Sequence, residues 1–105
     1  MTTLSTHVLD AALGRPAAGL DLTLTRPDGT STAGRTDDDG RAALEGELAP
    51  GMHILTFATG RWFDAQERAT FYPEVVVAFS VASADAHHHV AVLLSPFAYT
   101  TYKGS

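Results

Sequence analysis

The sequence predicts an all-β protein, an antiparallel sandwich of about seven to eight short strands with one short helix. Three observations support this fold class. Most segments between turns either alternate apolar and polar residues or are rich in β-branched residues. Turn signals recur at intervals of roughly eight to twelve residues, as they do in sandwiches. Finally, a single segment, 61–68, has the residue types of a helix, and it is barely two turns long.

In the first half of the chain, strands alternate with turns. Residues 4–10 and 20–25 alternate apolar with polar side chains, the pattern of a half-buried strand. Pro27–Thr30 forms a turn, because proline presets φ and glycine tolerates positive φ. The acidic turn Asp37–Gly40 then separates a strand that ends near Thr36 from a strand over 41–44.

The second half begins at Pro50-Gly51 with a run of strand-forming residues over 52–59. The short helix over 61–68 follows and ends before Phe71-Tyr72-Pro73. After Glu74 the β-branched run Val-Val-Val-Ala-Phe-Ser-Val-Ala predicts a strand that is buried on both faces, and 87–95 is similar. Residues 99–102 form a last short strand.

Composition limits the protein to one domain, residues 1–105, which is long enough to bury a core without disulfides. The chain has no Cys, so it has neither a thiol nucleophile nor a Cys-based zinc site, and we expect a cytoplasmic location. Seven Lys plus Arg against twelve Asp plus Glu give a net charge of -5, which argues against nucleic acid and anionic membranes as partners. No apolar stretch reaches the length of a spanning helix.

Two groups of histidines stand in predicted strands. By alternation, His7 shares a face with Ser5 and Leu9, while His87 and His89 share a face that His88 does not. From the residues alone these imidazoles could be solvated strand ends, a catalytic group, or a three-His zinc site of His7, His87 and His89. No carboxylate has recognisable ligand spacing, which argues against metal.

Arg41 follows the acidic turn directly. It could pair with Asp37 to Asp39 at the surface, or its planar donors could bind an anionic or carbonyl-rich ligand. Its position in the sequence does not decide between these alternatives.

Four blocks of the chain resemble the transthyretin-like family, in order and over essentially the whole length. They are His7-Val8-Leu9-Asp10 with Gly14-Arg15-Pro16-Ala17, then Asp39-Gly40-Arg41, then Phe71-Tyr72-Pro73-Glu74-Val75, and finally 87–105, which ends in Tyr102-Lys103-Gly104-Ser105. The resemblance implies a transthyretin-like sandwich. It also implies a homotetramer, a dimer of dimers with its active sites in the cleft between dimers.

Two branches of that family are known, a thyroid-hormone carrier and the 5-hydroxyisourate hydrolases of purine breakdown. The hydrolase pattern falls on His7, Arg41, His89 and residues 102–105, which favours the enzyme branch. The resemblance implies a catalytic group of His7, His89 and Ser105, and a substrate-binding group of Arg41, Tyr102, Lys103 and Gly104. It implies no cofactor and no metal. A carrier of a small aromatic ligand is the alternative.

Two positions depart from the family pattern. Lys103 stands where the family usually has Arg, so the charge is kept but the bidentate fork is lost. Ala91 stands where Pro is usual, which changes backbone stiffness near His89 and restores one N–H. The implied reaction adds water to a ring carbonyl, with activation of that water shared by His7 and His89 and the proton acceptor left open between them.

Overall fold

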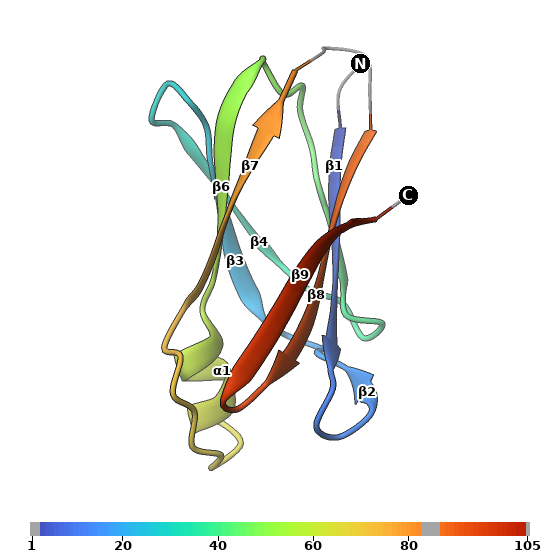
Figure 1. The fold of residues 1–105 in the computed structure, drawn as a ribbon, viewed down its shortest axis with the longest axis vertical. Coiled ribbons are helices and arrows are strands. Elements are labelled where there is room, and N and C mark those ends of the chain that lie inside the picture. The colour runs from blue at the N-terminus through green and yellow to red at the C-terminus, as the bar shows by residue number, and fades with distance from the viewer. Residues whose placement is uncertain (1–2, 83–86, 105) are drawn as a thin grey trace.

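Two β-sheets pack face to face in the computed structural model, which describes residues 3–82 and 87–104 (Figure 1). One sheet has the strand order β4 (Ser31–Arg35), β3 (Asp21–Thr25), β6 (Gly51–Phe57), β7 (Val75–Val81). The other has the order β2 (Arg15–Pro16), β1 (Thr3–Asp10), β8 (His87–Ser95), β9 (Ala98–Gly104), and β5 (Arg41–Leu44) also pairs with β1. The helix α1 (Thr59–Asp64) lies at one end of the sandwich (Figure 1).

The predicted all-β sandwich is confirmed, with nine strands in the described parts of the chain if the two-residue β2 is counted. One pairing differs from the antiparallel expectation, because β1 and β8 run parallel over their whole length. Parallel neighbours cannot be joined by a hairpin. Here they come from opposite ends of the chain, so the sequence between them provides the crossover.

Alternation along the strands builds the core. In β1, the inward residues Leu4, Thr6, Val8 and Asp10 are all buried, and the residues between them are only half-buried. The hydroxyl of Thr6 donates to the carbonyl of Val90 at 2.7 Å, which satisfies a polar group inside the core. The remaining core comes from both sheets and the helix, and includes Leu22, Leu24, Leu55, Phe57, Phe63, Val77, Val92 and Leu94.

Strand β7 corrects the expectation of burial on both faces. It is the edge strand of its sheet, and its side chains alternate between the core and solvent, with Val76 52% exposed. Its β-branched composition therefore reflects strand propensity more than two-sided burial. The helix is also earlier and shorter than 61–68, since Glu67 adopts a φ of 55°, which a continuing helix does not allow.

A buried ion pair connects the segment after α1 to the end of β1. Nη1 of Arg68 donates to Oδ2 of Asp10 at 2.7 Å, and the Arg68 guanidinium lies 4.8 Å from the centre of the Phe63 ring. Burial by itself raises the pKa of Asp10, but the hydrogen bonds from Arg68 and from the backbone of Leu13 and Ala12 outweigh it and lower the pKa.

No helix among residues 3–82 and 87–104 is long and apolar enough to cross a membrane.

Replacing Arg68 by Ala should lower the free energy of unfolding by about 3 kcal/mol at pH 7, because it leaves the buried Asp10 carboxylate without its partner. The pair stabilises the fold above the ordinary pKa of Asp10 and loses that effect as the pH falls through the lowered native value. The difference between variant and wild type should therefore shrink below roughly pH 4.

Urea unfolding at several pH values measures this effect. Arg61→Ala is the matched control, because Arg61 is exposed and its ion pair with Asp21 is 3.7 Å long. A difference between Arg68→Ala and wild type that stays constant down to pH 2 would show that only the packing of Arg68 on Phe63 matters.

Candidate active site

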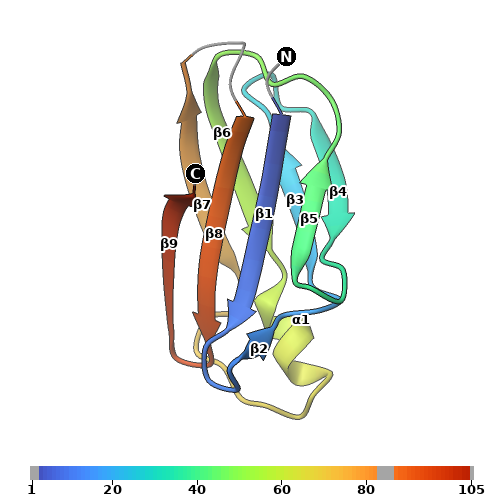
Figure 2. The same ribbon diagram turned by 90° about the vertical axis from the view of Figure 1, so that its right-hand side faces the viewer.

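The outward face of the β1–β8 sheet gathers most of the predicted site residues. Figure 2 looks onto this face, where β9, β8, β1 and β5 lie side by side. In the strand register, Ser5 lies beside His89 and His7 lies beside Ala91, while on the other edge of β1 His7 is the partner of Arg41. On β9, Gly104 is the partner of His89 and Tyr102 is the partner of Ala91.

His7 is held by the acidic turn. Its Nε2 lies 3.0 Å from the backbone carbonyl oxygen of Asp39. A carbonyl can only accept a hydrogen bond, so Nε2 carries the hydrogen. In the neutral ring the lone pair is therefore on Nδ1, and His7 can accept a further proton there.

The same turn places Arg41. The Asp37 carboxylate accepts from the backbone N–H of Asp39 at 2.9 Å and from that of Arg41 at 3.0 Å. Gly40 has a φ of 75°, and a Cβ there would overlap the carbonyl oxygen of Val8, so the turn requires glycine. No ion pair joins the Arg41 side chain to this turn, although all of its residues are described. Arg41 is exposed, and the planar donors of its guanidinium can bind an anionic or carbonyl-rich ligand.

His89 is half-buried and has close neighbours on both sides, Ser5 of β1 and Gly104 of β9. Its Nδ1 lies 2.7 Å from the hydroxyl oxygen of Ser5, which leaves Nε2 for other partners. Burial lowers the pKa of His89 below its ordinary value of 6.5. The positive charges of Arg41, His7 and His87 lower it further, in that order, so His89 is mostly neutral near pH 7.

Gly104 and Tyr102 border this group from β9. A Cβ on Gly104 would overlap Cδ2 of the His89 ring, so the ring can lie against β9 only because residue 104 has no side chain. Tyr102 is 53% exposed. Ser105, which sequence comparison with the family places in the catalytic group, lies outside the described residues.

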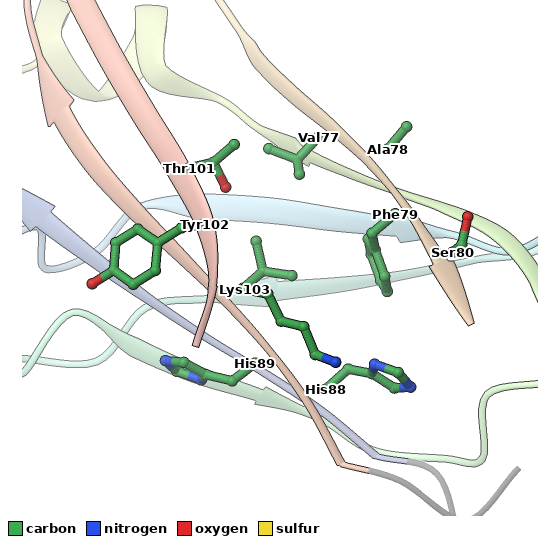
Figure 3. Close-up of a pocket in the computed structure, with 10 residues that line it drawn as sticks. Val77, Ala78, Phe79, Ser80, His88, His89, Thr101, Tyr102 and Lys103 are labelled. Atoms are coloured by element: carbon green, nitrogen blue, oxygen red, sulfur yellow. The ribbon is translucent and has the colours of Figure 1, made fainter. Parts of the chain in front are cut away.

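Lys103 belongs to the opposite face of β9. It lines a pocket of about 300 Å³ between β7 and β9, together with Val77, Phe79 and His88. Figure 3 shows the Lys103 side chain extending toward His88, with His89 and Tyr102 on the other side. Burial lowers the pKa of His88, and the Lys103 charge lowers it further. The structure therefore does not bring Lys103 into the group formed by His7, Arg41 and His89.

A fifth histidine that sequence analysis did not single out, His53, lies inside the sandwich. It is fully buried, and its ring stacks on Phe79 with centroids 5.7 Å apart. Its Nε2 and that of His88 have no hydrogen-bond partner within the described residues. Water in the neighbouring pocket is a suitable partner for such atoms.

Three imidazoles, His7, His87 and His89, share the outward face. Alternation predicted that His87 and His89 share a face, and the parallel register of β1 with β8 adds His7 to it. The parts of the chain that the structure describes contain no group of three His, Cys, Asp or Glu side chains arranged to hold a metal ion. His87 instead contacts hydroxyls, with Nε2 2.8 Å from Ser5 Oγ and Nδ1 against Thr3 Oγ1. Sequence analysis missed the role of Ser5, because its only signal was that it shares a face with His7.

Comparison with known proteins shows the family of this chain. A family model described as the HIUase/Transthyretin family matches residues 4–104. The 5-hydroxyisourate hydrolase of Caulobacter vibrioides is 44% identical over 115 aligned positions that cover 100% of both chains. The structure of Klebsiella pneumoniae 5-hydroxyisourate hydrolase matches with a TM-score of 0.90 at 34% identity, covering 98% of this chain and 99% of that one. Sea bream transthyretin in complex with thyroxine matches with a TM-score of 0.87 at 31% identity, covering 96% and 93%.

Replacing Gly104 by Ala should displace the His89 ring, because the new Cβ occupies its place. We expect the His89 ring resonances in NMR spectra to shift and the melting temperature to change little, since residue 104 is outside the core. Gly29→Ala is the contrasting variant, because at a φ of 88° it strains its own turn but places no atom against the His89 ring. Unchanged His89 resonances would show that the ring does not lie against residue 104.

Proposed function

Since the chain belongs to the HIUase/Transthyretin family, we propose that it hydrolyses 5-hydroxyisourate to 2-oxo-4-hydroxy-4-carboxy-5-ureidoimidazoline, a step of urate degradation. The observation that carries this proposal is the convergence of His7, Arg41 and His89 on one sheet face. Two imidazoles beside an exposed guanidinium are the groups that hydrolysis of an electron-poor ring requires.

In the reaction, the oxygen of a water molecule bonds to a ring carbonyl carbon and the neighbouring ring C–N bond breaks. One proton leaves the water, and the departing ring nitrogen gains a proton. His7 accepts a proton at Nδ1, because the carbonyl of Asp39 occupies Nε2–H. His89 can accept or donate at Nε2, because the Ser5 hydroxyl beside its Nδ1 can itself donate or accept.

Arg41 binds the substrate oxygens and stabilises the negative charge that develops on the attacked carbonyl oxygen. Tyr102 and Gly104 form the wall of the site on β9, with Ser105 as a further member that orients substrate or water. Lys103 supports this wall from the opposite face, where it lies near His88 (Figure 3). The chemistry calls on no cofactor, because the ring bond is already activated.

The alternative is a carrier of a small aromatic ligand, which the similarity to sea bream transthyretin suggests. A carrier has no need of two imidazoles with free ring nitrogens. In the structural comparison, identity to the Klebsiella pneumoniae hydrolase, at 34%, also exceeds identity to that transthyretin, at 31%. Hydrolysis is therefore the function that the site supports best.

The site also supports the proposed homotetramer, a dimer of dimers. His7, Arg41 and Tyr102 lie on an open sheet face of the single chain, whereas small ligands are normally bound in enclosed clefts. A second copy packed against this face would enclose the substrate and exclude bulk water. The location of the protein remains the one predicted from the sequence, the cytoplasm.

Purified protein mixed with freshly generated 5-hydroxyisourate should speed the decay of the substrate's ultraviolet absorbance above the spontaneous rate.

His7→Ala and His89→Ala should each lower kcat by about 100-fold or more, as expected for acid–base groups. Activity should also fall as the pH drops through the lowered pKa of His89, because the protonated ring cannot accept a proton. His53→Gln, at the buried ring that faces away from the site, is the control. If the wild-type protein does not accelerate the decay of 5-hydroxyisourate, hydrolysis is contradicted and the carrier is the remaining candidate function.

Light scattering should give a mass about four times the 11.1 kDa of the chain. The face that carries His7 and Arg41 should also become protected from hydrogen exchange upon assembly. A monomeric mass at assay concentration would contradict both the tetramer and the enclosed site.

A further inference from the structure

A chain of polar side chains leads from His89 to the surface along β1 and β8. The hydroxyl oxygen of Ser5 lies 2.7 Å from Nδ1 of His89 and 2.8 Å from Nε2 of His87. Thr3 Oγ1 is within hydrogen-bond distance of the remaining ring nitrogen of His87. The parallel register, which pairs Thr3 with His87 and Ser5 with His89, brings all four side chains to one face.

The hydroxyl of Ser5 has one hydrogen, so it cannot donate to both imidazoles. If it donates to His87, it must accept from His89 Nδ1–H. The neutral His89 ring then carries its lone pair on Nε2. If it donates to His89, it accepts from His87 Nε2–H, and His89 carries its hydrogen on Nε2. The Ser5 hydroxyl thus forms a bridge between His87 and His89, and this bridge couples the tautomers of the two rings.

From this geometry we propose that Ser5 and His87 form a proton relay that exchanges protons between His89 and solvent. The proposal rests on the hydrolase function proposed above. In the outward step, the Nδ1–H bond of a doubly protonated His89 breaks and an O–H bond forms on Ser5. The former O–H bond of Ser5 breaks and an N–H bond forms at Nε2 of His87. The net change is one proton moved from His89 to His87.

Charge and burial around the two rings favour this direction. His89 is half-buried and faces the positive charges of Arg41 from β5 and His7 from β1, whereas His87 is exposed to water. Burial and those charges lower the pKa of His89, so a proton gained during the reaction is held weakly there. The carboxyl group formed by the hydrolysis ionises at neutral pH, so each turnover releases one proton in net. His87 passes this proton to water and resets His89 for the next turnover. Ser5 is thus a positioning residue, since it acts through His89 and His87.

His87→Gln tests the relay, because the amide keeps a hydrogen-bonding group near the Nε2 position but cannot carry a net proton. We expect kcat in weak buffer to fall by roughly 10- to 100-fold with KM unchanged, the loss typical when the partner of a functional imidazole is removed. Added imidazole, which can accept protons from His89 directly, should restore kcat in the variant and leave the wild type unaffected. An unchanged kcat, or a loss that imidazole does not restore, would overturn the relay.

Ser5→Ala and Ser5→Thr test the bridge itself. Alanine removes the hydroxyl and should lower kcat as His87→Gln does, whereas threonine keeps an Oγ atom and should retain most activity. Ser95→Ala, which removes a serine hydroxyl at the far end of β8, is the matched control. A Ser5→Ala variant with wild-type kcat would contradict the bridge.

NMR of the histidine rings separates failure of the relay from failure of the proposed function. Correlation of ring nitrogens with ring protons shows which nitrogen carries hydrogen, without any substrate. Ser5→Ala should change the patterns of His87 and His89 together. Unaltered patterns would refute the bridge, whereas altered patterns in a protein that does not hydrolyse 5-hydroxyisourate would refute only the enzymatic role.

Discussion

The parallel pairing of β1 with β8 is the constraint on which the rest of the site depends. It joins a strand from the start of the chain to one from near its end, and its register sets Ser5 beside His89 and His7 beside Ala91. A shift by one residue would turn every side chain of one strand to the other face. The register is held by the core, because Leu4, Val8, Val90 and Val92 must all face inward for the sandwich to bury its apolar surface.

The same alternation that builds the core also separates the histidines into two groups with different surroundings. His7, His87 and His89 face outward, where water, hydroxyls and Arg41 surround them, whereas His88 and the fully buried His53 face the space between the sheets. Burial lowers the pKa of His88, and the inward pair is suited to filling space and binding water. The outward group can take up and release protons because solvent is within reach.

Backbone details then place the ligand-facing groups. The turn at Asp37–Gly40 satisfies its own N–H groups with a carboxylate, which leaves a carbonyl to hold His7 and directs Arg41 into β5. On the other side, the missing side chain of Gly104 gives the His89 ring room against β9. Both sides of the site thus depend on glycines whose replacement would create steric overlap rather than a lost contact. The hydrolase relatives are similar over nearly the whole chain, so both sides of the site lie within the matched region.

By itself, the sequence determined the fold class, most strand positions and the opposite faces of His88 and the pair His87 and His89, because alternation and turn residues are local signals. Strand 87–95 coincides with β8, and the family resemblance identified His7, Arg41 and His89 together. Local signals could not show that β1 pairs in parallel with β8, that β7 is an edge strand, or that Lys103 faces away from its predicted neighbours. These features follow from which strands become neighbours. That choice is made by burial across the whole sandwich. It also makes Ser5, which the sequence placed only on the face of His7, the link between two imidazoles.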